Sequence, residues 1–212
     1  MLYKQWANRS ISSTYEPGST FKSIVLAAAL EEGVVSESST FYCSGVAQVD
    51  GWTGDPIKCS DRDGHGTQTL AKAVANSCNP AFIAIGQALG AEKFYNYLED
   101  FGFLEKTGID VLGESNINPV SAGLIWDRDK FTNVDLAVAS FGQRFQVTPL
   151  QLANYMATLL NGGDHLVPHL LKTVKSSDYA ETVYEQEREV RNSLELDPAN
   201  VEAVKQLSLI HI

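Results

Sequence analysis

The stretch Tyr15-Glu16-Pro17-Gly18-Ser19-Thr20-Phe21-Lys22 runs directly into the apolar segment Ser23-Ile24-Val25-Leu26-Ala27-Ala28-Ala29-Leu30. The Pro-Gly pair predicts a turn, and the apolar run predicts a buried helix that begins near Ser19. Residues three apart on a helix share a face, so the Lys22 amine is expected to lie over the Ser19 hydroxyl. Free N–H groups at the helix start would surround that hydroxyl. The pattern favours a nucleophilic serine with a lysine base, although Ser-x-x-Lys alone is more often a helix cap followed by a solvated lysine.

A second polar segment, Asn76-Ser77-Cys78-Asn79-Pro80, lies between two predicted helices. Pro80 follows Asn79 as a first helical residue follows its cap. Alternate residues of an extended turn project to the same side, so the Ser77 hydroxyl and the Asn79 amide are expected together, with Cys78 pointing into the core. A hydroxyl can relay a proton and an amide can hold a carbonyl. For this segment alone, helix capping is the alternative interpretation.

Together, Ser19-x-x-Lys22 and Ser77-x-Asn79 resemble the first two signatures of the penicillin-recognising serine acyltransferases. Further segments occur in the order found in class B penicillin-binding proteins: residues 8–22, His65-Gly66-Thr67, residues 77–82, Ser140-Phe141-Gly142-Gln143 and residues 147–153. On these segments the chain is identified as a member of that family over about residues 3–172.

The resemblance implies a D,D-transpeptidase that cross-links peptidoglycan stem peptides. Ser19 is then the nucleophile, and Lys22 is its base, with a pKa lowered by burial and neighbours. Ser77 passes a proton to the departing D-alanine, and Asn79 binds the substrate. β-Lactams would acylate Ser19 because they resemble the D-Ala-D-Ala terminus. The resemblance implies no cofactor and no metal ion.

The third family signature, Lys-Thr-Gly followed by Ser or Thr on a sheet strand, has no counterpart after Gln143. Lys106-Thr107-Gly108 comes before Phe141 and is followed by Ile109, so we interpret it as a surface segment and not as the active-site strand. In the family that strand supplies a cation and an oxyanion donor, and losing one such donor costs about two to three orders of magnitude in turnover. We therefore expect the isolated chain to fold incompletely and to lack full activity.

The fold implied by the resemblance is α/β of the α+β type, an antiparallel sheet flanked by helices, of which this chain holds mainly the helical part. Residues 1–212 are expected to form a single partial transpeptidase domain, cut at both ends, with the start of the sheet and a helix at 173–206. An apolar tail, Leu207–Ile212, follows. Helices are expected at 19–32, 67–76, 80–89, 91–101, 148–161 and 198–207.

Composition restricts the partners. The formal net charge of −10 argues against nucleic acid, and the sequence has no run of about twenty apolar residues that would span a membrane. The resemblance implies stem peptides and β-lactams as ligands and a membrane glycosyltransferase as partner. It also implies a location at the extracytoplasmic face of the bacterial cell membrane, with an N-terminal anchor outside this chain.

The three cysteines leave one without a pair. Cys43 and Cys59 flank a glycine-rich segment that predicts a hairpin, and they either form a disulfide outside the cytoplasm or remain free. The cysteines and histidines do not follow a Cys/His metal-binding spacing. His65 is interpreted as a loop or cap residue.

Two other functions stay open. A β-lactamase-like hydrolase or β-lactam sensor would share Ser19 and Lys22, but a hydrolase needs a base for deacylation, and no carboxylate motif after Asn79 indicates one. A non-catalytic scaffold module in cell-wall assembly is the third possibility. Replacing Ser19 with Ala in the full-length gene separates the scaffold from the enzymes, because an unchanged cross-linking phenotype would favour the scaffold.

Overall fold

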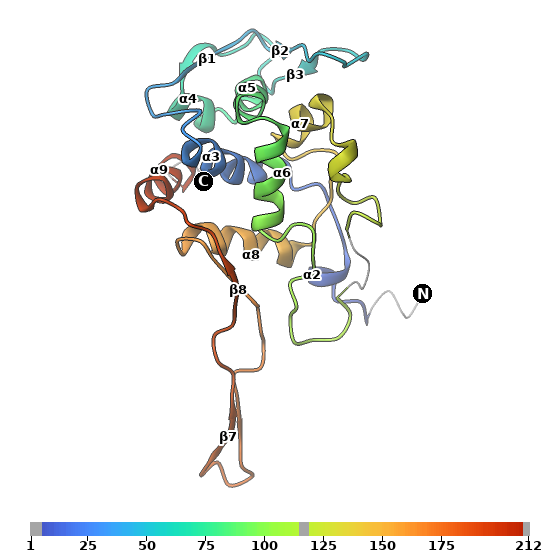
Figure 1. Cartoon of the computed structure of the whole chain (residues 1–212), viewed down its shortest axis with the longest axis vertical. Helices are drawn as coiled ribbons and strands as arrows, with labels where there is room; N and C mark the ends of the chain where they lie inside the picture. The colour runs from blue at the N-terminus through green and yellow to red at the C-terminus, as the bar shows by residue number, and fades with distance from the viewer. Residues whose placement is uncertain (1–5, 115–118, 210–212) are drawn as a thin grey trace.

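The computed structural model describes residues 6–114 and 119–209. The start of the resemblance at Tyr3 and the last three residues of the apolar tail lie outside the described residues. Figure 1 shows a helical body, a β-rich segment on one side of it, and a long hairpin that projects away from it.

Helical elements and strands occur in separate runs along the chain. The helical elements are α2 (Arg9–Ser12), the 3-10 helix η1 (Gly18–Phe21), α3 (Lys22–Glu31), α4 (Leu70–Ala75), α5 (Asn79–Leu89), α6 (Ala91–Asp100), the 3-10 helix η2 (Arg128–Lys130), α7 (Asn133–Ala139), α8 (Pro149–Leu160) and α9 (Pro198–Leu209). The strands are β1 (Thr40–Cys43), β2 (Val46–Ala47), β3 (Ile57–Lys58), β4 (Gly66–Thr69), β5 (Asp164–Leu166), β6 (Thr173–Lys175), β7 (Thr182–Glu185) and β8 (Val190–Ser193).

Within the described residues the strands form four separate antiparallel pairs, β1–β4, β2–β3, β5–β8 and β6–β7. The expected sheet is therefore present only as short two-stranded pieces. The helix expected from residue 67 begins at Leu70 instead, because residues 66–69 pair with β1 in the register Thr40↔Thr69. Thr69 then caps α4 by accepting a hydrogen bond from the Lys72 N–H.

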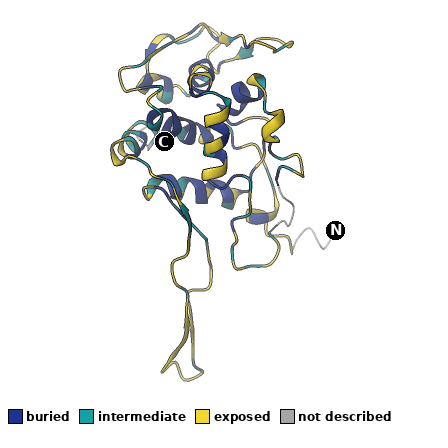
Figure 2. Cartoon of the chain, in the orientation of Figure 1, coloured by how far each residue is buried: buried dark blue, intermediate teal, exposed yellow. Residues whose placement is uncertain are grey.

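Helix α3 is the centre of the core, as its apolar sequence predicts. Residues 24–30 are all buried, and the helix packs against α5, α6, α8 and α9. Figure 2 shows it as a buried element inside the helical body. The first turn differs from the expected helix over 19–32: Gly18–Phe21 is 3-10 helix, and α3 proper begins at Lys22.

Aromatic packing fixes the start of α3. The Phe21 ring is 1% exposed, and its centroid lies 4.9 Å from that of Phe145, 5.3 Å from that of Phe103 and 6.0 Å from that of Phe94. Rings at these spacings contribute more than their buried area alone. This packing holds the turn that carries Ser19 against α6 and the segment before α8.

The remaining helices begin and end close to their predicted limits. Thr148 and Gln151 form a capping box, with Pro149 at the first position of α8. Helix α7 was not predicted. It is a short, buried helix with its own capping box between Thr132 and Asp135, and its periodic pattern is too brief to stand out. None of the helices in the described part of the chain is long and apolar enough to cross a membrane.

Candidate active site

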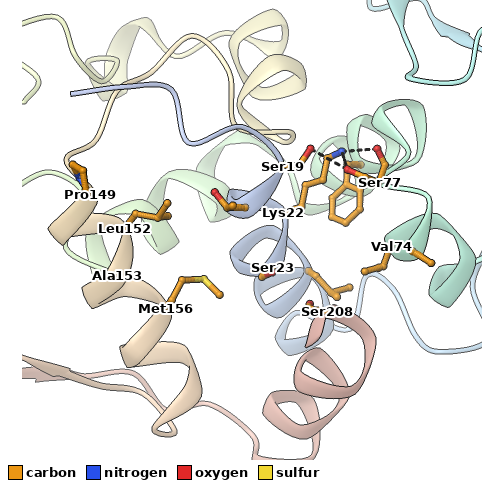
Figure 3. Close-up of a pocket in the computed structure, with 14 residues that line it drawn as sticks. Ser19, Lys22, Ser23, Val74, Ser77, Pro149, Leu152, Ala153, Met156 and Ser208 are labelled. Carbon is orange, nitrogen blue, oxygen red and sulfur yellow. Dashed lines mark hydrogen bonds between the residues drawn. The ribbon is translucent and has the colours of Figure 1, made fainter. Parts of the chain in front are cut away.

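The four residues predicted for the site converge at the start of α3. Ser77 Oγ donates to Ser19 Oγ over 2.9 Å. Lys22 Nζ donates to Ser77 Oγ over 2.9 Å (Figure 3). It also donates to Asn79 Oδ1 over 2.8 Å. Hydrogen bonds therefore link Ser19 to Lys22 through the Ser77 hydroxyl, and not by the direct contact that helical spacing suggested.

Lys22 does not contact Ser19 directly because all three N–H donors of its ammonium group bind other acceptors. Besides Ser77 Oγ and Asn79 Oδ1, it donates to the Ser77 carbonyl oxygen over 2.7 Å. Two acceptors belong to Ser77 in the loop between α4 and α5, and the third belongs to Asn79, the first residue of α5; we call residues 77–79 the Ser77–Asn79 loop. The lysine thus joins the central helix to this loop, and Ser19 meets the loop through one hydroxyl.

The loop reaches this position through a strained residue. Ser77 has a φ of +47°, in the left-handed region that residues with a Cβ rarely occupy. Strain of this kind persists only where surrounding contacts enforce it, and it is concentrated at functional sites. Here it brings both the hydroxyl and the carbonyl oxygen of Ser77 to the Lys22 amine.

Cys78 and Asn79 complete the turn as predicted. Cys78 is fully buried, so it points away from the site that its two neighbours form. The Asn79 side chain is used at both ends, because its Nδ2 donates to the Lys58 carbonyl oxygen over 3.2 Å. The amide nitrogen carries a second N–H, which a substrate carbonyl could accept.

Burial sets the ionisation of Lys22. The side chain is only 5% exposed, and desolvation lowers its pKa from 10.5 to about 8, while the nearby Cys78 and Cys59 thiols oppose that shift. The ammonium nitrogen also lies 5.1 Å from the centroid of the Phe82 ring. An amine with this pKa is partly neutral near pH 7–8, as a general base requires.

A cavity of about 510 Å³ opens beside these groups. Its wall is polar at Ser19, Lys22 and Ser77 and apolar along Leu26, Val74, Leu152 and Met156, with Ser208 of α9 at one side (Figure 3). Pockets that bind organic ligands commonly combine an apolar lining with a few convergent polar groups. The nucleophile candidate is the exposed member of the set, so a ligand in this cavity can reach it.

A contact between Gly18 and Gly142 fixes the backbone next to Ser19. The Gly18 N–H donates to the Gly142 carbonyl oxygen over 2.8 Å, and a Cβ added to Gly142 would lie 2.0 Å from the Gly18 oxygen. Gly142 also has a φ of +80°. Residues 140–143 contribute to the family resemblance, which assigns them no role. The structure shows that only glycine fits at 142.

The other expectations fall outside the cavity. Lys106-Thr107-Gly108 lies in the loop after α6 and does not line the cavity, but it is not simply a surface segment. Thr107 is 2% exposed, and its N–H and hydroxyl both donate to the Glu114 carboxylate. Cys43, Cys59 and Cys78 are all free, so the disulfide alternative for the first two is not formed.

Comparison with known proteins gives one family. Residues 2–207 match the family model described as the penicillin binding protein transpeptidase domain. Stage V sporulation protein D of Bacillus subtilis is 44% identical over 166 residues, which cover 78% of this chain and 24% of that protein. The peptidoglycan D,D-transpeptidase MrdA of Acinetobacter baumannii is 32% identical over 170 residues, 78% of this chain and 25% of that protein.

Solved structures agree with the sequence matches. The structure of penicillin-binding protein A from M. tuberculosis as a penicillin G acyl-enzyme complex superposes with a TM-score of 0.75 at 28% identity. The superposition covers 95% of this chain and 44% of that one. The α+β fold expected from the sequence is thereby confirmed. The chain spans about a quarter of the length of the curated relatives that it matches.

Proposed function

Because the chain belongs to the penicillin binding protein transpeptidase domain family, we propose that it is the acyl-transferring part of a peptidoglycan D,D-transpeptidase that also binds β-lactams. The proposal rests on the hydrogen-bonded series Ser19–Ser77–Lys22 at the wall of the cavity, with Lys22 also bonded to Asn79. Relatives named D,D-transpeptidases and a neighbour solved as a penicillin G acyl-enzyme support it.

Acylation follows from the order of these groups. Ser19 Oγ attacks the penultimate D-alanine carbonyl of a stem peptide, and its proton moves to the Ser77 hydroxyl while Ser77 passes its own proton to neutral Lys22. Collapse of the tetrahedral intermediate breaks the peptide bond. The proton returns through Ser77 to the amine of the departing D-alanine, which leaves an ester on Ser19.

The second half of the reaction reverses the relay. The amine of a neighbouring stem peptide attacks the ester carbonyl, gives up its proton through Ser77, and releases Ser19 as the cross-linking amide bond forms. Asn79 would hold the substrate backbone during both steps with its second amide N–H, while the first stays on the Lys58 carbonyl oxygen. A β-lactam acylates Ser19 by the same attack, with opening of its ring in place of D-alanine release.

The substrate also bears on the compartment and the partner. Stem peptides are cross-linked outside the cytoplasmic membrane, so we propose that this domain acts at the extracytoplasmic face of the membrane beside a glycosyltransferase that extends the glycan strand. Fractionation of cells that produce the tagged protein tests the location.

The test of acylation is labelling with a fluorescent penicillin, followed by peptide mass spectrometry. We expect one adduct, on the peptide that contains Ser19, and none in the Ser19→Ala variant. Ser36→Ala, which removes an exposed hydroxyl remote from the cavity, is the matched control and should label normally. Equal labelling of Ser19→Ala would refute the assignment.

A second measurement separates transfer from hydrolysis. The protein is given a D-Ala-D-Ala-terminated peptide together with a D-amino acid acceptor. A transpeptidase releases D-alanine and forms the exchange product. Release of D-alanine without exchange, or rapid loss of the penicillin adduct as hydrolysed product, would favour the hydrolase alternative.

A further inference from the structure

Three thiols and one imidazole meet on the far side of the Ser77–Asn79 loop. The ligand atoms of Cys43, Cys59, His65 and Cys78 all lie within 4.8 Å of one another. Cys59 Sγ is 3.9 Å from Cys78 Sγ and 3.7 Å from His65 Nδ1. Sequence spacing gave no sign of this group, because its members come from four places along the chain.

The spacing matches a metal site and not a disulfide. Zinc binds thiolate sulfur at about 2.3 Å in a tetrahedron, which places two such sulfurs about 3.8 Å apart. The observed separation of Cys59 and Cys78 has that value, whereas a disulfide would require about 2.05 Å. Four side chains of ligand type thus lie close enough together to share one ion, and the two separations measured from Cys59 Sγ match a tetrahedral site.

The surrounding segment has few buried apolar side chains of its own. Between α3 and α4, residues 36–69 form the β1–β4 segment, whose buried apolar side chains are Cys43, Val49 and Cys59. The two cysteines join Cys78 and two alanines in a small cluster separate from the main core. A cluster of this size buries little apolar area, and small units of this kind usually need a disulfide or a metal ion for stability.

The backbone around the cluster is built to hold the thiols in place. A Cβ on Gly45 would lie 2.2 Å from the Arg62 oxygen, and one on Gly64 would lie 2.4 Å from the Cys43 oxygen, so the two loops touch backbone to backbone. The Gly45 N–H points at Cys43 Sγ over 3.5 Å. Such N–H···S contacts from neighbouring residues accompany thiolate ligands in metal sites.

We propose that Cys43, Cys59, His65 and Cys78 bind one zinc ion as a structural site. Three thiolates and an imidazole in a closed tetrahedron suit zinc, and four protein ligands leave no open position for catalysis. Cys43 is 1% exposed, Cys59 2% and Cys78 0%, with His65 half-buried, so the ion would be shielded from solvent.

The site would act on the catalytic loop through Cys78. This ligand lies between Ser77 and Asn79, so an ion bound to it ties the loop to β1 and to the segment after β3. The restraint falls on the backbone that holds Ser77 at positive φ and presents its hydroxyl to Lys22. The ion thus takes a positioning role and touches no reacting atom.

Metal content of the purified protein is the first test. The protein is prepared with a thiol-free reductant and zinc sulfate, desalted, and measured by elemental mass spectrometry. We expect about one zinc per chain. Cobalt in its place should give the intense thiolate charge-transfer and d–d absorption of a tetrahedral sulfur site. No zinc retained by the reduced, folded protein would overturn the proposal.

Variants assign the ligands. Cys43→Ser and Cys59→Ser should each retain less than about a tenth of an equivalent of zinc, whereas Ser44→Ala, beside the first ligand, should retain the full equivalent. Equal zinc in wild type and both cysteine variants would overturn the assignment. His65→Cys keeps four ligands and should bind zinc with an altered cobalt spectrum, and His169→Ala, an exposed histidine elsewhere, should change nothing.

Chelation keeps the test valid if the cysteine variants do not fold. A strong chelator added to the wild-type protein should lower Tm by roughly 5–10 °C, and zinc should restore it. An unchanged Tm together with a stable Cys59–Cys78 disulfide, found by peptide mapping without reduction, would favour a redox pair over a metal site. Because these readouts do not involve penicillin, they can fail or succeed independently of the acylation test.

Discussion

The Ser77–Asn79 loop lies between two clusters of very different size. On one side Lys22 projects from α3, which is embedded in a large apolar core with an aromatic cluster around Phe21. On the other side Cys78 lies in a small cluster made almost entirely of thiols and alanines. The candidate catalytic groups therefore lie at the boundary between a large apolar core and the small cluster for which we propose a zinc ion.

The candidate site thus combines a lysine held by a packed helix with a loop under strain. The helical side fixes the position of Lys22, because a close-packed core permits little movement. The loop side supplies the acceptors for Lys22, and it holds Ser77 in a conformation that costs free energy. Some variants should therefore change mainly the acylation rate, and others mainly the free energy of unfolding.

The largest effect is expected from Lys22→Met. Acylation by penicillin should fall by about 10³-fold or more, because the base is gone while the apolar volume is kept. The free energy of unfolding should change by less than about 1 kcal/mol, since relief of a buried charge offsets three lost hydrogen bonds. Stopped-flow labelling and urea unfolding measure the two quantities.

The control for Lys22→Met is Lys93→Met. Lys93 forms an ion pair with Glu32 at 2.5 Å with its side chain about half exposed, and pairs of this kind contribute about 0–1 kcal/mol. Labelling should be unchanged in this variant. A Lys22→Met protein that labels at the wild-type rate would remove the lysine from the mechanism.

An intermediate effect is expected from Gly142→Ala. The added Cβ meets the Gly18 oxygen at 2.0 Å at a positive φ, so the free energy of unfolding should fall by about 2–4 kcal/mol and the Ser19 turn should shift. Urea unfolding and the labelling rate report both effects.

Gly33→Ala isolates the cost of positive φ. Gly33 has a φ of +62° with no atom within 4 Å of an added Cβ, so only about 1 kcal/mol should be lost, with labelling intact. Equal losses in the two variants would mean that the contact between residues 18 and 142 has no role in placing the nucleophile.

The smallest effect is the pH dependence of acylation. The reactive form of Lys22 is the neutral amine, so the rate should rise with pH through the pKa of about 8, by roughly tenfold between pH 7 and pH 9. The same lowered pKa predicts that stability also rises between about pH 8 and 10.5, because the unfolded chain there binds more protons than the folded one. A labelling rate that is flat over this range, after subtraction of spontaneous β-lactam hydrolysis, would contradict the role of Lys22 as base.

The sequence was sufficient for the parts of the site that depend on local spacing. Ser19-x-x-Lys22 and Ser77-x-Asn79 each lie on a short turn beside a helix, so their convergence could be expected from the motifs and the resemblance. The relay through Ser77 could not, because it depends on how three donors of one ammonium group are shared among acceptors of a distant loop.

Features set by tertiary contacts were missed for a common reason. β4 replaced the start of a predicted helix because pairing with β1 outweighed local propensity. Buried Thr107 owes its position to Glu114 seven residues later. The cysteines and His65 meet only after β1, the segment after β3 and α5 are brought together, so neither their spacing nor their number indicated a shared site.

The hairpin of β6 and β7 offers a practical use that its structure makes plain. Every residue of both strands is exposed, and the strands pair only with each other as they extend from the body (Figures 1 and 2). Its turn, around Asp178 and Tyr179, can therefore accept a peptide tag or a fluorophore without disturbing the groups around Ser19. A dye placed there would give a fixed reference point for distance measurements by energy transfer to a labelled penicillin on Ser19.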